Sequence, residues 1–228
     1  MRFAFYFCAL LFPALARASL ITSAASLVQP VALVNFSQFP GPFAFGPGPV
    51  QVGSLAGLDI SWSSTNSVNQ GGAVIGSSAY NLGTNGSWTS DRFGYVALNA
   101  GVGSMTLMFA DGPVSQVGAY LNYAPNAGPG VVIAALDQNG NPLESHDLSV
   151  VAPIVTPGGL NAGAFRGIQR AELDIFGFRV SNSGVALDDL QLSTQVPEPG
   201  SFTLAAIGCI AGGVVVWRSR RSQCNRCA

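Results

Sequence analysis

Lysine is absent from the 228-residue sequence, and charged residues of all kinds make up only 9% of it. Soluble proteins average about 25% charged residues, so glycine, serine and asparagine must supply much of the polar surface here. Without lysine, Schiff-base chemistry has no side chain to use. Cysteine is missing from residues 19–195, which excludes a disulfide framework for that segment. The cysteines lie instead at Cys8, Cys209, Cys224 and Cys227.

Basic charge is scarce in the same central segment. Residues 19–195 hold 10 Asp and Glu against 4 Arg, a formal charge of −6. A nucleic-acid-binding surface needs the opposite sign, because its affinity comes from Lys and Arg on phosphates, so this class of partner is excluded. The segment is long enough to form one domain with its own hydrophobic core.

The first 18 residues have the three-part order of a secretory signal peptide. Arg2 supplies the positive charge, residues 3–15 are apolar, and Ala16 and Ala18 form an A-x-A site. The apolar run is shorter than the roughly 20 residues that span a bilayer, which favours a cleaved leader over an anchor. We therefore predict export through the Sec translocon and cleavage after Ala18.

A second uncharged run, residues 201–217, is followed at once by a basic cluster of Arg218, Arg220 and Arg221. Its length is at the lower edge for a transmembrane helix. The arginines would hold the C-terminus in the cytoplasm, which places residues 19–195 on the opposite side of the membrane. The alternative is a core helix, which Gly208 and the Gly212-Gly213 pair would weaken in water.

Directly before this run stands the sequence Val196-Pro197-Glu198-Pro199. Two prolines disfavour helix and hold an extended peptide that a protease can bind. The order of Pro-Glu-Pro, a short apolar segment and a basic cluster resembles the PEP-CTERM sorting signal of Gram-negative bacteria, over Val196 to Arg226. This resemblance implies recognition of residues 197–199 by an exosortase, a membrane cysteine protease that removes the tail.

The resemblance also implies a route and a location. The protein would be tethered transiently in the inner membrane and then reach the cell surface or extracellular matrix, in species that often make exopolysaccharide. Residues 196–228 would form the sorting signal, with 218–228 as its basic cytoplasmic tail. One Cys224-x-x-Cys227 pair is too few ligands for a structural zinc site, so we interpret that end as a solvated tail.

Residues 19–195 show short strand-length runs separated by Gly, Asn, Ser and Pro, and no convincing amphipathic helix. This pattern predicts an all-β domain, an antiparallel β-sandwich or jelly roll. The Asn139-Gly140 pair indicates a tight hairpin. The strands are expected at residues 31–36, 57–62, 73–75, 93–98, 105–110, 117–123, 131–136, 144–150, 171–178 and 185–192.

Residues 114–194 also resemble the β-sandwich domain common among PEP-CTERM proteins. The matching motifs are VGAY at residues 117–120, LDQNG at 136–140 and ALDDL at 186–190. The resemblance implies the fold and leaves the function open, because similar sandwiches serve as carbohydrate-binding modules and as plain structural domains.

Asp188 and Asp189 interrupt an apolar strand. If the strand alternates regularly, Asp188 shares a face with Ala186 and Leu190, so one carboxylate lies among apolar neighbours. A buried carboxylate needs hydrogen-bond donors or a cation. One interpretation is a structural Ca²⁺ bound by Asp188 and Asp189, and the other is backbone hydrogen bonding at a bulge or turn.

The sequence offers little for catalysis, and we predict no enzyme and no resident cofactor. His146 is the one histidine, and no G-x-S-x-G, H-E-x-x-H or phosphate-loop motif occurs. Glu144 and Glu172 are the only glutamates of the central segment, and nothing else favours them as a glycosidase pair. Carbohydrate binding is the alternative function. Rings available for stacking on sugars are Trp62, Tyr80, Trp88, Tyr95 and Tyr123.

Overall fold

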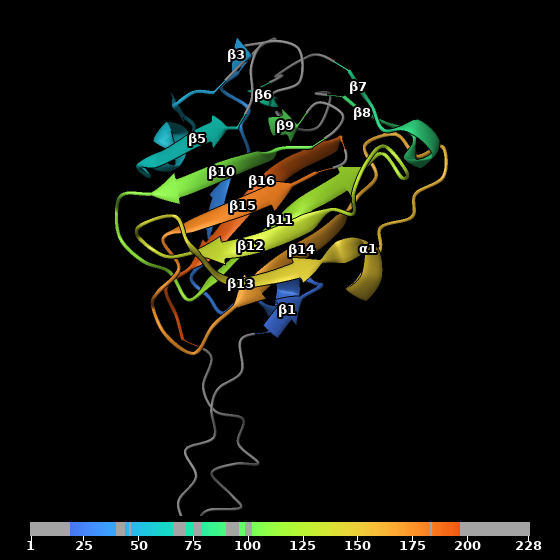
Figure 1. The fold of residues 1–228 in the computed structure, drawn as a ribbon. Helices are drawn as coiled ribbons and strands as arrows, with labels where there is room; N and C mark the ends of the chain where they lie inside the picture. Colours follow the sequence, from blue (N-terminus) through green and yellow to red (C-terminus); the bar gives the residue numbers. More distant parts are fainter. Residues whose placement is uncertain are drawn as a thin grey trace, which may run out of the picture.

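The computed structural model describes residues 19–39, 44–45, 47–65, 72–74, 79–89, 96–98, 102–182 and 184–196. Within them, the chain forms two antiparallel sheets packed face to face (Figure 1). The prediction of an all-β antiparallel sandwich is confirmed. The predicted signal peptide, the Pro-Glu-Pro motif, the apolar run and the basic tail all lie outside the described residues.

One sheet has eight strands among the described residues, and β16 lies at its centre. β16 pairs on one side with β11, and on the other side with β9 near its start and β2 near its end. In sheet order, the strands are β1 (Ser19–Ile21), β14 (Ala164–Gln169), β11 (Gln116–Tyr123), β16 (Val185–Ser193), β9 (Val96–Leu98), β6 (Gly72–Val74) and β3 (Ala44–Phe45), with β2 (Ala32–Val34) beside β16.

The second sheet has six strands in the described part of the chain, and a two-stranded ribbon stands apart from both sheets. In order, the six strands are β13 (Pro142–Asp147), β12 (Val132–Leu136), β15 (Gly177–Ser181), β10 (Ser104–Phe109), β5 (Ile60–Ser64) and β4 (Val50–Gln51). The ribbon is β7 (Tyr80–Asn81) with β8 (Ser87–Trp88), and the helical turns are η1 (Ala24–Ser26), η2 (Ser54–Ala56), η3 (Gly83–Asn85) and α1 (Leu148–Val151).

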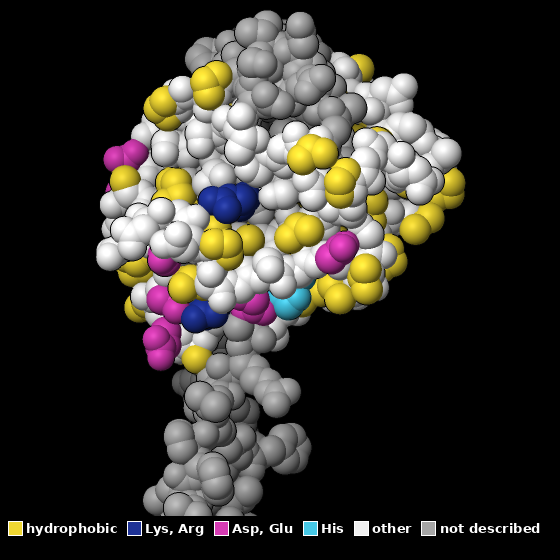
Figure 2. Space-filling model, viewed as in Figure 1, with side chains coloured by type: hydrophobic (Ala, Val, Ile, Leu, Met, Phe, Trp, Pro, Cys, Tyr) yellow, Lys and Arg dark blue, Asp and Glu magenta, His cyan; other side chains and the backbone are white. Residues whose placement is uncertain are grey.

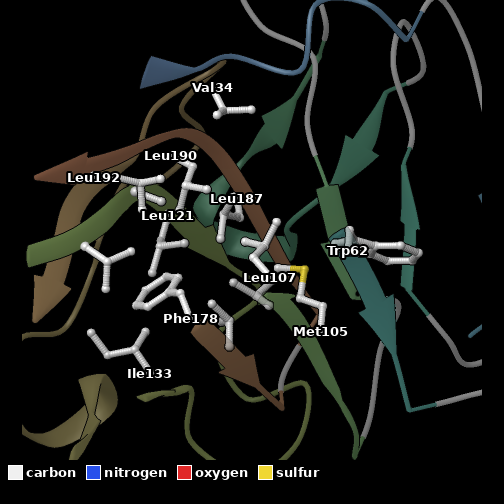
Figure 3. Packing of buried hydrophobic residues seen from close by; sticks show 14 of the residues in the cluster. Val34, Trp62, Met105, Leu107, Leu121, Ile133, Phe178, Leu187, Leu190 and Leu192 are labelled. Atoms are coloured by element: carbon white, nitrogen blue, oxygen red, sulfur yellow. The ribbon is translucent and has the colours of Figure 1, made fainter. Parts of the chain in front are cut away.

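The main core fills the space between the two sheets. Alternate residues of each inner strand point into it, as expected for a sheet with one buried face. In Figure 3, Leu121 and Leu187 of the eight-stranded sheet face Leu107 and Phe178 of the six-stranded sheet. Alternation along β10 and β11 places residues 105, 107 and 109, and residues 117, 119, 121 and 123, on one face of their strand, and all seven belong to this cluster.

The outer face of the eight-stranded sheet is also covered. Trp88 of the β7–β8 ribbon and Leu82 pack on Ala186 of β16. Beside them, Ile21 and Leu27 of the N-terminal segment pack on Phe165 of β14. This second layer explains why polar residues on that outer face become buried.

Two strand predictions need correction. The range 171–178 is mostly a loop, which a bidentate pair from Arg170 to Asp174 closes, and the strands lie on either side of it as β14 and β15. The sequence pattern did not predict β14, because Gly167 interrupts its apolar run. An added Cβ at Gly167 would lie 2.5 Å from the Val117 carbonyl oxygen, so the glycine is what allows β11 to approach. Residues 148–150 are helical, since the Asp147 carboxylate caps α1.

The predicted hairpin joins β12 to β13. Gly140 has φ +79°, and Asp137 accepts the amides of Asn139 and Asn141, each at 2.8 Å. Asn139 is not among the residues with positive φ, so only the glycine of the Asn-Gly pair uses left-handed backbone. The turn is therefore a type I turn with a glycine bulge rather than a two-residue loop.

Candidate functional site

The last residues of the sandwich are held by side chains from neighbouring segments. Ser115, just before β11, donates its hydroxyl to the carbonyl oxygens of Ser193 at 3.1 Å and Gln195 at 2.6 Å. The Ser193 hydroxyl donates to the Val28 carbonyl at 2.5 Å and accepts the Gln195 amide at 3.2 Å. Ser115 and Ser193 are buried, whereas Val196 is 41% exposed. The chain therefore leaves the domain at a fixed point, directly before the predicted sorting motif.

The start of the described chain lies near this exit. Ser19 is opposite Gln169, Gln169 is opposite Gln116, and Gln116 is opposite Ser193, so one cross-strand row joins β1 to the end of β16. Three strand spacings place Ser19 about 14 Å from Ser193. We call the end of the sandwich that holds Ser19, the start of β11 and the end of β16 the tail end, and the opposite ends of the same strands, toward η3 and α1, the far end.

The distance from the exit to the predicted membrane segment is short. Ser201 follows Gln195 by six residues, and an extended chain spans at most about 3.5 Å per residue, so the two are separated by no more than about 20 Å. If residues 201–217 span the bilayer, the tail end faces the membrane. Within the described residues, no helix has the length and apolar character to cross a membrane.

The tail end is acidic. Asp111 lines a cavity together with Leu192 and Thr194 at the end of β16, and its carboxylate accepts the Asp59 amide at 2.6 Å. The loop after β14 adds Glu172, which is exposed. Figure 2 shows several acidic side chains at the lower left of this face, and others at its upper left and right. Asp174 is neutralised by Arg170, whose pKa rises through the hydrogen bond to that carboxylate.

Asp188 and Asp189 lie at a β-bulge in β16. The register with β11 shifts between Gly118 and Tyr120, and Asp189 has φ +47°. The Asp188 Oδ1 accepts the Asp189 amide at 2.7 Å. On the other side of β16, the partner strand changes from β9 to β2 across the same two residues. The interpretation as backbone hydrogen bonding at a bulge is thus confirmed.

The bulge changes the phase of the strand, so the expectation of regular alternation is wrong. Leu187 and Leu190 both face the main core, although they are three residues apart. The one extra residue that the bulge adds to β16 brings both side chains to the same face. Asp188 is therefore on the outer face with Ala186, not on the face of Leu190.

Asp188 is fully buried, and its Oδ2 has no hydrogen-bond partner. Burial raises its pKa from 3.8 to about 9, so this carboxyl keeps its proton at neutral pH. Burial also raises the pKa of Asp189. Calcium takes six to eight oxygen ligands. Among the described residues, no three or more His, Cys, Asp or Glu side chains gather into a metal-binding group. Calcium binding at Asp188 and Asp189 stays a prediction.

The aromatic side chains that could stack on sugars are mostly buried. Trp62 and Trp88 are at most 1% exposed and Tyr123 is 6% exposed. Burial raises the pKa of the Tyr80 hydroxyl to about 12. Tyr95 lies outside the described residues. Trp62, Trp88 and Tyr123 therefore stabilise the fold and do not offer open ring faces.

His146 contacts Glu144, with Nε2 at 2.6 Å from Oε1. Arg170, after β14, lies 3.8 Å from the other oxygen of Glu144. Because β13 and β14 lie near the edges of different sheets, these residues join the two layers of the sandwich. His146 and Glu144 are thus held against each other on β13.

The far end carries a cavity of about 470 Å³. Tyr123, Asn126 and Ile154 are among its lining residues. The Tyr123 hydroxyl accepts the Ile154 amide at 3.1 Å, which leaves its proton available to another acceptor. Asn85 holds this end together, because its side-chain amide donates to the carbonyls of Tyr123 at 2.9 Å and Ile154 at 3.0 Å.

Comparison with known proteins gives weak structural similarity and one specific motif. No curated protein matches the sequence. The carbohydrate-binding module CsCBM6-3 from Clostridium stercorarium, solved with cellobiose, is 15% identical, covers 58% of this chain and 87% of its own, and has a TM-score of 0.32. The lectin-binding domain of Lectinolysin, a His 62 mutant complexed with Lewis b, is 11% identical, covers 57% and 99%, and has a TM-score of 0.31. Similarity this low carries no argument about function.

The fold and the exit geometry define an antiparallel β-sandwich whose chain leaves one end just before a C-terminal targeting segment. That segment is specific: the PEP-CTERM protein-sorting motif matches residues 195–221. The chain therefore carries a PEP-CTERM sorting motif. The match includes the residues quoted from the sequence, Val196, Pro197, Glu198, Pro199, Arg218, Arg220 and Arg221.

Proposed function

We propose that this chain is a non-enzymatic protein of the cell surface or extracellular matrix, exported by the Sec translocon and processed by an exosortase. The observation that carries the proposal is the PEP-CTERM motif at residues 195–221, directly after a folded domain. Its signal peptide would end at Ala18, and its location would be the outer surface of a Gram-negative bacterium, among exopolysaccharides.

The geometry of the domain supports this route. A chain inserted through a leader and then held by a C-terminal segment has both ends at the membrane. Here Ser19, the predicted first residue after cleavage, and Ser193 lie at the tail end, and the far end is free to point outward.

The test is processing in a bacterium that makes an exosortase. Changing Pro197 and Pro199 together to alanine should block removal of the tail, so the protein stays larger and remains in the membrane fraction. Pro142→Ala, an exposed proline on β13, is the matched control and should be processed normally. Wild-type size and location of the double variant would refute exosortase processing.

After cleavage, the acidic tail end should favour release. Asp59, Asp111 and Glu172 would face the headgroups of an anionic membrane, and like charges within a Debye length repel. We expect the processed protein not to bind anionic vesicles at low salt, and a D59N/D111N/E172Q variant to bind them more. Wild-type binding that equals that of the variant would contradict this role for the charges.

A second candidate is glycan binding at the far-end cavity. The supporting observation is that this cavity stays accessible while the tail end faces the membrane, and that the Tyr123 hydroxyl proton is available inside it. Asn126, which lines the cavity, has φ +62°, so Asn126→Gly removes the side chain without strain. Binding on a glycan array that this variant weakens would support the candidate, and a blank array with folded protein would refute it.

A further inference from the structure

The exit of the chain is built from groups that otherwise belong to the sandwich. We define the exit clamp as the hydroxyls of Ser115 and Ser193 with the backbone groups of Val28 and Gln195 that they bind. The amide of Ser115 also donates to the Ser193 carbonyl at 2.9 Å. Both polar groups of the Gln195 backbone, its N–H and its C=O, are therefore already hydrogen-bonded to the domain.

Proteases bind a substrate as an extended strand, through main-chain hydrogen bonds over several residues around the site. The residues that precede Pro197 are part of that strand. Gln195 is only two residues away, and its backbone is bound to the clamp although its side chain, like those of Thr194 and Val196, is exposed. The folded domain and the protease thus compete for the same backbone groups.

We propose that the exit clamp limits access of the exosortase to the motif, so that residues 194–195 must detach from Ser115 before the tail is processed. This inference rests on the proposed function. It makes Ser115 a positioning residue that sets the rate of processing through the folded domain, without touching the reacting bond.

The size of the effect follows from the bond that is lost. Ser115→Ala removes the hydroxyl that binds the Gln195 carbonyl but keeps the Ser115 amide and the strand pairing. A single hydrogen bond contributes about 1 kcal/mol net, which corresponds to about a fivefold change in the population of detached tail. If detachment limits processing, the half-life of the precursor should fall about fivefold.

The experiment is pulse-chase labelling of the full chain in the exosortase-producing bacterium. Ser115→Ala should be processed about fivefold faster than wild type, and Ser145→Ala, an exposed strand serine, should match wild type. Inserting Gly-Ser-Gly-Ser between Gln195 and Val196 leaves the clamp intact but adds free backbone before the motif. This insertion should also speed processing, and Ser115→Ala should then add little to it.

The outcomes separate the two proposals. Precursor half-lives of Ser115→Ala and of the insertion that equal or exceed that of wild type would overturn the clamp, and the insertion keeps this test valid should Ser115→Ala fold poorly. If the Pro197 and Pro199 double variant is processed like wild type in the same assay, the proposed function itself fails. If only that double variant is blocked, the clamp alone is refuted.

Discussion

The buried carboxyl of Asp188 should make the stability of this protein fall as pH rises. The pKa is 3.8 in an exposed chain and about 9 in the folded state, because burial disfavours the charged form. Between these values, the unfolded chain has lost the proton and the folded protein has kept it. The folded state then binds one more proton, so the free energy of unfolding decreases with pH.

The magnitude follows from the single proton. Each pH unit inside this window costs at most about 1.4 kcal/mol, so the loss between pH 5 and pH 8 is up to about 4 kcal/mol. Below about pH 4 and above about pH 9, the contribution of Asp188 levels off, because both states then carry the same charge. Asp189 also lowers the free energy of unfolding as pH rises, because burial raises its pKa as well. A domain is stable by only about 5 to 15 kcal/mol, so the effect is large.

Asp188→Asn isolates the effect. The amide oxygen can still accept the Asp189 N–H, as the Asp188 Oδ1 does at 2.7 Å, but the side chain no longer titrates. Urea unfolding of the purified protein at pH 5, 6, 7 and 8 should show a shallower pH slope for the variant, with the difference reaching at least about 2 kcal/mol across the range. Glu172→Gln, an exposed carboxyl, should keep the wild-type slope. Parallel slopes for wild type and Asp188→Asn would refute the reasoning.

Substitutions near the far end should also separate structural roles. Asn85→Ala removes the donor that binds the carbonyls of Tyr123 and Ile154. The free energy of unfolding in urea should fall by about 2 to 3 kcal/mol, and a decrease below about 0.5 kcal/mol would contradict a stabilising role for these hydrogen bonds. Gly86→Ala should lower the thermal midpoint strongly, because its Cβ would clash with the backbone oxygen of Gly159. Gly57→Ala, also at positive φ but with open space around it, should cost only about 1 kcal/mol, and equal losses in the two variants would refute the steric cause.

The exit clamp had no recognisable signal in the sequence. Ser115 directly precedes β11 and Gln116 is its first residue, and serine and glutamine are ordinary residues at the end of a strand. Their burial arises because the N-terminal segment around Val28 and the end of β16 both reach them. These partners are separated by more than 70 positions along the chain, and no local pattern encodes such contacts.

The Asp188-Asp189 bulge shows how far local reasoning extends. The sequence indicated that a carboxylate would lie among apolar residues, and it left a cation and a bulge as alternatives. Locating the bulge required the register with β11 and the change of partner from β9 to β2. The same bulge reversed the expected alternation, because a single added residue changes which face every later side chain occupies.

By itself, the sequence determined the all-β class, the alternation of the inner strands and the C-terminal sorting motif, since each depends on residues that are close together in the chain. Tertiary structure alone decided that both ends of the domain emerge at the tail end, that the rings of Trp62, Trp88 and Tyr123 are buried, and that the chain is held as far as Gln195. These properties depend on which strands become neighbours, and strand order is set by packing the whole chain around one core.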